Sequence, residues 1–163
     1  MSQISRIDHC SEKNFEYVKS LGATHVVDYN DKSLIEKVLN YTNGYGIDKL
    51  LNTSGRNTDI ALSDLLAFNG HFLELLDVVR PTEYNDVFMR NLSFHQLSLG
   101  AAHRYGGDKA KKQLTEVGEK ILSLVENGSI KLPLIKTISI QDMPETLKEM
   151  RNAHTKGKYV LVL

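Results

Sequence analysis

The chain has 163 residues, 41% of them hydrophobic and 25% charged, with 20 Lys and Arg against 20 Asp and Glu. This composition is typical of one globular domain, and zero net charge argues against nucleic acid or an anionic membrane as a partner. Apolar runs are far shorter than a bilayer span and the N-terminus lacks the stretch of a signal peptide, so we expect a cytoplasmic protein. Cys10 is the only cysteine, which excludes an internal disulfide.

Hydrophobic periodicity in the first half of the chain predicts strands that alternate with helices. The predicted strands cover residues 4–9, 24–29, 47–52 and 71–76. Ser11 stands at the N-cap of the first helix, and Gly22 ends it. The apolar positions of the three helices are Phe15, Val18 and Leu21, then Leu34, Ile35, Val38 and Leu39, then Ile60, Leu62, Leu65 and Leu66.

The same alternation continues in the second half of the chain. A short helix is predicted from Pro81 towards Met89, followed by a strand over residues 92–99. The longest helix is predicted over residues 108–126, with an apolar stripe of Leu114, Val117, Ile121, Leu124 and Val125. A strand over 134–140, a helix capped by Asp142 and a strand over 159–163 complete the prediction.

Strands that alternate with helices favour parallel pairing with right-handed crossovers, and so a doubly wound α/β sheet. Ligands of such sheets bind at the carboxyl ends of the strands. Here those ends include Cys10-Ser11, Asp28-Tyr29 and residues 52–55, so we expect any binding site to be assembled from these segments.

Four segments carry a family resemblance. Residues 10–29, CSEKNFEYVKSLGATHVVDY, resemble the medium-chain dehydrogenase/reductase family from the end of its second nucleotide-domain strand. Residues 43–48, 65–76 and 157–161 are similar to its entry into strand four, its approach to strand five and its closing segment. The resemblance covers nearly the whole chain, which looks like the C-terminal portion of a zinc-type alcohol dehydrogenase-like or quinone oxidoreductase-like protein.

The resemblance implies an incomplete Rossmann-like doubly wound parallel sheet that lacks the first strand and the glycine-rich turn. No G-x-G-x-x-G occurs in this sequence, so the usual cradle for a pyrophosphate is missing from it. Residues 1–131 would then form a partial dinucleotide-binding domain. Residues 132–163 would form a strand–helix–strand segment that in relatives returns to the catalytic domain. Family zinc ligands would lie outside this chain, so we expect no zinc in it.

NADP(H) is the cofactor that the resemblance implies. An NAD-using relative has an acidic residue at the end of its second strand, where the nearest register of this chain places His9. Ser11, Lys13 and Tyr29 are similar to the hydroxyl, lysine and tyrosine around a 2′-phosphate in NADPH-preferring quinone oxidoreductases. Asn14 replaces Lys13 if the register shifts by one residue. Alternatively, these residues are only a helix cap, a solvated lysine and a strand-end aromatic.

Two further segments would face the cofactor. Thr53, Ser54 and Gly55 lie where the fourth strand of the family passes the ribose, and the glycine would permit close approach of the backbone. Lys158 resembles a basic position near the pyrophosphate. The alternatives are a turn and cap for the first segment and an exposed lysine for the second.

The histidines show no metal-binding or catalytic pattern. None forms an i, i+4 helical pair, and no Gly-x-Ser-x-Gly motif occurs. We expect surface or structural roles for all six, which are His9, His25, His71, His95, His103 and His154.

The missing central strand of the family order 3-2-1-4-5-6 would remove on the order of 10 kcal/mol of burial, against a total stability of about 5–15 kcal/mol for a domain. We therefore expect residues 4–9 to pair directly with residues 47–52, which gives the order 3-2-4-5-6. In dimeric relatives the strand equivalent to residues 92–99 pairs with its two-fold mate, so we expect a homodimer through this strand.

The function implied for the parent is hydride transfer between a nicotinamide and a carbonyl, enone or quinone. We expect the chain to be a truncated NADP-linked oxidoreductase with weak or no activity alone. The alternative is a non-catalytic remnant that acts through self-association or by docking to a full-length relative.

Overall fold

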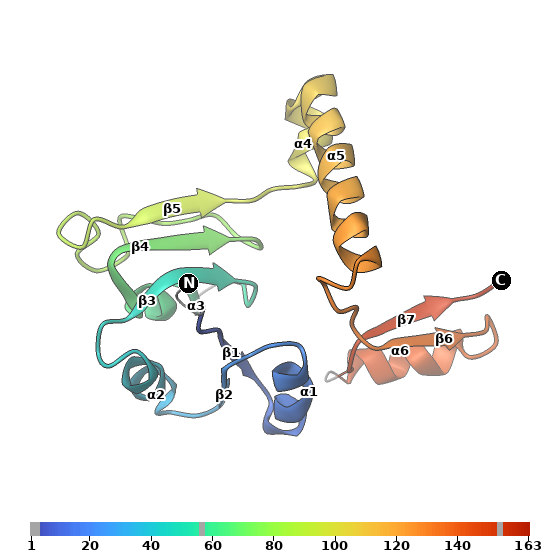
Figure 1. The fold of residues 1–163 in the computed structure, drawn as a ribbon, viewed down its shortest axis with the longest axis horizontal. Coiled ribbons are helices and arrows are strands. Elements are labelled where there is room, and N and C mark those ends of the chain that lie inside the picture. Colours follow the sequence, from blue (N-terminus) through green and yellow to red (C-terminus); the bar gives the residue numbers. More distant parts are fainter. Residues whose placement is uncertain (1–3, 56–57, 153–154) are drawn as a thin grey trace. The chain divides into compact units, whose positions relative to one another are not determined.

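Strands and helices alternate along the computed structural model, which describes residues 4–55, 58–152 and 155–163 (Figure 1). The strands are β1 (Ile7–Cys10), β2 (His25–Asp28), β3 (Ile47–Asn52), β4 (Leu66–Glu74), β5 (Ser93–Gln96), β6 (Ile135–Ile138) and β7 (Lys158–Leu161). The helices are α1 (Phe15–Ser20), α2 (Leu34–Tyr41), α3 (Thr58–Ser63), α4 (Ala101–Tyr105), α5 (Gly107–Glu126) and α6 (Met143–Arg151), with a 3-10 turn at Glu12–Asn14.

All the strand pairs that the structure describes are parallel, as predicted. They form the sheets β1-β2, β3-β4-β5 and β6-β7. Within the described segments β1 pairs with β2 and β3 pairs with β4, as the predicted order requires, and the direct pairing of residues 4–9 with residues 47–52 stays a prediction.

The chain divides into two compact units. The central unit is Tyr29–Lys111, and the terminal unit combines Met1–Asp28 with Lys112–Leu163. Each unit has its own internal contacts.

The core of the central unit lies on one face of the sheet β3-β4-β5. Leu50, Phe72 and Phe94 are register partners across the three strands, and Phe72 is completely buried. Tyr84 stacks against the rings of both Phe72 and Phe94, with centroid distances of 5.9 and 5.2 Å. Because side chains alternate across a strand, His71 points to the opposite, exposed face.

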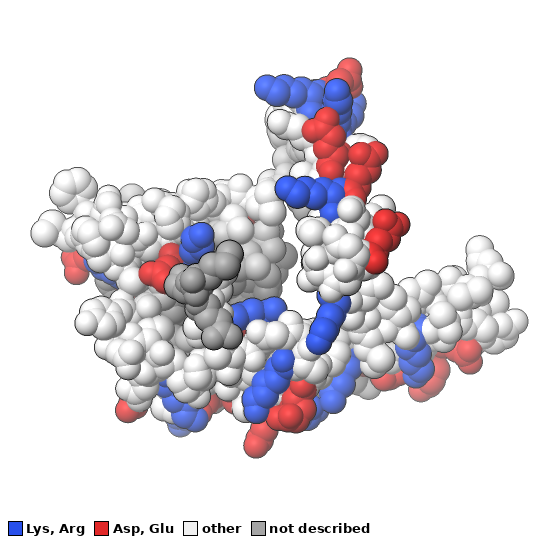
Figure 2. Space-filling model, viewed as in Figure 1, with Lys and Arg blue, Asp and Glu red and all other residues white. Residues whose placement is uncertain are grey.

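The terminal unit buries fewer side chains. Val26 and Val27 of β2 are buried, whereas no residue of α5 or α6 is. Tyr17 of α1 accepts a hydrogen bond through its hydroxyl from the Leu134 amide at 3.1 Å, which links the two ends of the unit. Acidic and basic side chains are interspersed along α5 (Figure 2).

Three local predictions are corrected by the structure. Residues 81–89 form turns rather than a helix, because Asp86 has a positive φ of 49° and the Arg80 amide donates to the Tyr84 hydroxyl at 2.9 Å. Leu66 begins β4 rather than continuing a helix, since it pairs with Ile47. The strand predicted over residues 92–99 is confined to β5, and α4 was not predicted.

Candidate functional site

The carboxyl ends of β1 and β2 lie at the same edge of their sheet. Cys10 and Asp28 are register partners, and Ser11 and Tyr29 directly follow them. Burial, followed by the carboxylates of Asp8 and Asp28, raises the pKa of the Cys10 thiol. The thiol therefore stays protonated at neutral pH and is a poor nucleophile.

The turn after β1 carries polar atoms without a hydrogen-bond partner. Ser11 has an extended backbone, with φ −66° and ψ 146°, and occupies the N-cap position as predicted, but its side chain makes no cap hydrogen bond. The Oγ of Ser11 and the Oδ1 of Asn14 are both buried and unpaired, while Lys13 between them is exposed. Unpaired buried oxygens are costly, so this turn is suited to a ligand that brings hydrogen-bonding groups and negative charge.

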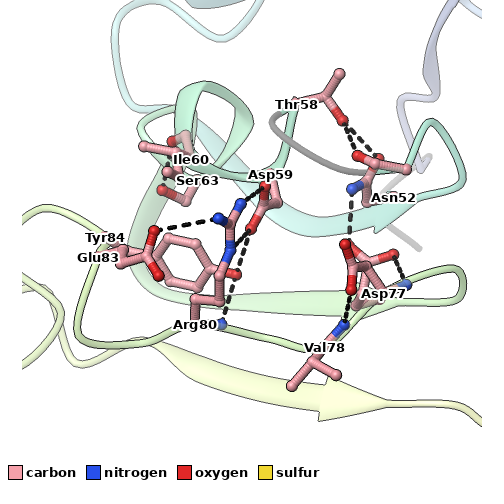
Figure 3. A network of polar contacts seen from close by, with 12 residues as sticks. Asn52, Thr58, Asp59, Ile60, Ser63, Asp77, Val78, Arg80, Glu83 and Tyr84 are labelled. Carbon is pink, nitrogen blue, oxygen red and sulfur yellow. Dashed lines mark hydrogen bonds and ion pairs between the residues drawn. The ribbon is translucent and has the colours of Figure 1, made fainter.

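A buried polar pair joins the carboxyl ends of β3 and β4 (Figure 3). Asn52 and Glu74 are register partners, each 1% exposed, and the Asn52 amide donates to Glu74 Oε2 at 2.7 Å. The other carboxylate oxygen of Glu74 accepts from the amides of Leu76 at 2.8 Å and Asp77 at 3.2 Å. One carboxylate thus fixes both the end of β3 and the loop after β4.

The loop after β3 is held by the other end of the Asn52 side chain. Its Oδ1 accepts from the Ser54 amide at 3.0 Å, and the Thr58 hydroxyl donates to the Gly55 carbonyl at 2.8 Å. Thr53 and Ser54 remain exposed. Gly55 has a positive φ of 81°, and a Cβ placed there would meet nothing within 4 Å. The loop therefore presents an exposed, open backbone at the sheet edge.

A second network anchors α3 to the segment after β4. Asp59 is 3% exposed and receives hydrogen bonds from Arg80 Nε at 3.1 Å and from the Tyr84 hydroxyl at 2.9 Å (Figure 3). Burial opposes ionisation of Asp59, but the hydrogen bonds from Arg80 and Tyr84 hold the pKa of its carboxyl below the ordinary value. Burial and the bond to Asp59 raise the pKa of Tyr84.

The predicted site residues fall into separate groups. Ser11, Lys13 and Asn14 share the turn after β1, and residues 53–55 share the loop after β3. Tyr29 is 45% exposed at the start of the central unit. Lys158 begins β7. The preceding Gly157 has a φ of 78°, and a Cβ there would collide with the Leu134 carbonyl, so both the backbone conformation and the space require glycine.

Sequence reasoning missed the two buried networks. Asn52 and Glu74 each follow two apolar residues at the end of a strand, in LLN and FLE, and this was the available signal. Their contact depends on the strand register, which no local pattern reveals. Asp59 and Arg80 lie 21 positions apart and carried no signal.

The described residues contain no group of three or more His, Cys, Asp or Glu side chains placed to hold a metal ion. This donor set does not fit a zinc centre with three or four protein ligands. Among the helices that the structure describes, none is long and apolar enough to cross a membrane.

Comparison with known proteins identifies relatives over most of the chain. Residues 21–161 match the sequence profile of the family described as zinc-binding dehydrogenase. A mycocerosic acid synthase-like polyketide synthase of Mycolicibacterium smegmatis is 29% identical over 154 residues, which are 93% of this chain and 7% of that protein. The chain thus spans only a small part of the curated relatives that it matches.

Solved structures share the fold. A quinone oxidoreductase of Pseudomonas syringae superposes with a TM-score of 0.76 at 18% identity, over 98% of this chain and 49% of that chain. The CurK enoyl reductase superposes with a TM-score of 0.73 at 20% identity, over 94% of this chain and 45% of that one. The resemblance in fold therefore extends over about half of each of these proteins.

Proposed function

Because the chain belongs to the zinc-binding dehydrogenase family, we propose that it forms part of an NADP(H)-dependent oxidoreductase. The parent reaction would be hydride transfer between a nicotinamide and a carbonyl, enone or quinone. The matching structures include a quinone oxidoreductase and an enoyl reductase, which supports this class of reaction. The chain would supply a Rossmann-like sheet without its first strand, and its activity alone would be weak or absent.

The unpaired oxygens at the turn after β1 carry the proposal of NADP(H) as cofactor. The Ser11 hydroxyl could donate to a 2′-phosphate, and Asn14 Oδ1 could accept from a hydroxyl or amino group. The exposed ammonium of Lys13 would add charge at the same turn, and Tyr29 would flank it. A phosphorylated ribose would thereby satisfy atoms that the protein leaves without partners.

The loop after β3 would hold the second half of the cofactor. Thr53 and Ser54 would offer hydroxyls to a ribose, and the backbone at Gly55 would allow a close approach. The bound nicotinamide would supply or accept the hydride. Asn52 and Glu74 would act by holding the loop in place. Lys158 would contribute positive charge towards the pyrophosphate.

The division of the chain follows from this proposal. Residues 1–131 would be the partial dinucleotide-binding domain, and residues 132–163 would return to a catalytic domain supplied elsewhere. A cytoplasmic location is part of the same proposal.

Isothermal titration with NADPH, NADP⁺ and NADH tests the cofactor. We expect NADPH to bind with a Kd below about 100 μM, equivalent to roughly −5.5 kcal/mol. Lys13→Ala should weaken NADPH binding by about tenfold and leave NADH binding unchanged, because only NADPH carries the 2′-phosphate. Lys120→Ala, a change of an exposed lysine on α5, is the matched control. If none of the three nucleotides binds, cofactor binding by this chain is refuted.

Self-association is the second candidate function. We propose a homodimer through residues 92–99, since β5 is an edge strand of its sheet and Leu97 and Leu99 are exposed. An alternative partner is a full-length relative. Sedimentation at tens of micromolar should detect a dimer that Leu97→Lys dissociates and Leu122→Lys on α5 does not. A monomer at that concentration would rule out the homodimer.

A further inference from the structure

Two histidines meet on the exposed face of the central sheet. On this face the register sets Lys49, His71 and Ser93 side by side, and Leu51, Leu73 and His95 in the next row. His71 and His95 are thus diagonal neighbours on adjacent strands, and both are exposed. The hydrogen-bonded strands fix the spacing of the two backbone positions, so the pair belongs to a rigid part of the unit.

The two imidazoles are close enough to share one ligand. The Nδ1 of His71 lies 3.1 Å from the Nε2 of His95, and the stacked rings have centroids 5.4 Å apart at an interplanar angle of 18°. Two zinc–nitrogen bonds of about 2.0–2.1 Å that meet near the tetrahedral angle place their nitrogens about 3.3 Å apart. The observed separation is therefore close to that of two imidazoles on one metal ion.

We propose that His71 and His95 together bind a divalent transition-metal cation, with water in the remaining coordination positions. Imidazole nitrogen favours Cu²⁺, Ni²⁺ and Zn²⁺ over Mg²⁺ and Ca²⁺, which prefer oxygen ligands. In the metal-free pair one of the two facing ring nitrogens donates a hydrogen bond to the other. Metal binding needs the lone pairs of both nitrogens, so the donating imidazole takes its other tautomer and carries its proton on the opposite ring nitrogen. The pair includes none of the proposed cofactor residues and does not depend on that proposal.

Lys49 is the charged side chain next to the pair in the register. Its ammonium lowers the affinity for a cation, although the long side chain can extend into solvent. Lys49→Met is therefore expected to strengthen metal binding modestly, which a chance association elsewhere on the chain would not show.

Calorimetric titration of the full chain, free of any histidine tag, tests the site with Cu²⁺, Zn²⁺ and Mg²⁺. We expect one equivalent of Cu²⁺ to bind more tightly than Zn²⁺, and no heat of binding with Mg²⁺. His71→Gln and His95→Gln should each weaken Cu²⁺ and Zn²⁺ binding by about tenfold or more. His103→Gln, a change of an exposed histidine on α4, should leave the affinity unchanged.

A direct measurement guards against loss of folding in the variants. In the unaltered chain, diamagnetic Zn²⁺ should shift the ring-proton NMR signals of His71 and His95 together and more than those of His103. Unchanged affinity in both glutamine variants, or equal shifts at all three histidines, would overturn the proposal.

Discussion

The central and terminal units are made of the same kinds of element but bury their side chains very differently. Among the residues that the structure describes, all four buried polar or charged side chains belong to the central unit, and they are Asn52, Asp59, Ser63 and Glu74. The buried residues of the terminal unit are Ala23, Val26 and Val27. Three adjacent parallel strands offer a row of inward-facing side chains wide enough to bury aromatic rings, whereas two strands do not.

The two units also differ in whether their buried polar atoms have hydrogen-bond partners. The carboxylates of Glu74 and Asp59 each have several hydrogen-bond donors, so their burial is compensated. In the terminal unit, by contrast, Ser11 and Asn14 keep buried oxygens without partners. Satisfied networks support the fold of the central unit, whereas the terminal unit leaves these two buried oxygens without partners.

Removing the central aromatic ring is expected to have the largest effect on stability. Phe72→Ala should lower the free energy of unfolding of the central unit by about 3–5 kcal/mol, because a fully buried ring leaves a cavity. Ile121→Ala on α5, where the side chain is 48% exposed, should cost less than about 1 kcal/mol. Amide hydrogen exchange measures the loss of stability, in β4 for the central unit and in β2 for the terminal unit. Equal losses of unfolding free energy for the two variants would contradict the expected difference between the two units.

Breaking the buried ion pair should cost nearly as much. Arg80→Ala leaves the carboxylate of Asp59 buried without its cation, and we expect a loss of about 3 kcal/mol in urea denaturation. The matched change in the terminal unit is Arg6→Ala, whose ion pair with Asp8 is more exposed, with 50% of the arginine and 29% of the aspartate side chain accessible, and should contribute about 1 kcal/mol. A similar loss from both variants would show that burial does not distinguish the pairs.

Removing the side-chain bond between the ends of β3 and β4 should have an intermediate effect on stability. Asn52→Ala removes one donor to Glu74 and one acceptor for the Ser54 amide, and should cost about 1–3 kcal/mol. The same variant should weaken nucleotide binding if the loop over residues 53–55 contacts the cofactor. Thr53→Ala, which changes an exposed side chain of that loop, should alter binding without this loss of stability.

The smallest expected effect is the change of stability with pH that comes from Asp59 and Tyr84 of the central unit. The pKa of Asp59 is lower in the folded chain than its ordinary value of 3.8, so its contribution is complete above that pH and lost as the pH falls through the folded pKa. The pKa of Tyr84 is raised above 10.0, so its contribution is lost as the pH rises above that value. Asp59→Asn should flatten the acid limb in denaturation titrations. An unchanged acid limb would exclude Asp59 as its source.

Local patterns predicted the alternation of strands and helices and the parallel pairing, because side-chain periodicity reflects the face that each element buries. The local patterns failed where contacts between residues distant in the sequence determine the structure. Residues 81–89 lack a helix because Arg80 and Tyr84 bond to each other and to Asp59. The direct pairing of residues 4–9 with residues 47–52 stays a prediction, because β1 and β3 belong to different units.

The sequence predicted that the candidate residues lie at strand ends, but not the contacts that hold them there. Topology placed Ser11 and residues 53–55 at strand ends, and the structure has them there. Whether they bind NADP(H) stays a prediction. The support of the loop by Asn52 and Glu74 could not be foreseen, since it depends on a strand register.

The bond between Asn52 and Glu74 has an evolutionary consequence. Because one carboxylate is shared by two strand ends, a substitution at either position should be harmful alone and tolerated once the other position changes to match. Positions 52 and 74 should therefore vary together among homologous sequences, as a co-inherited pair rather than as two independent sites.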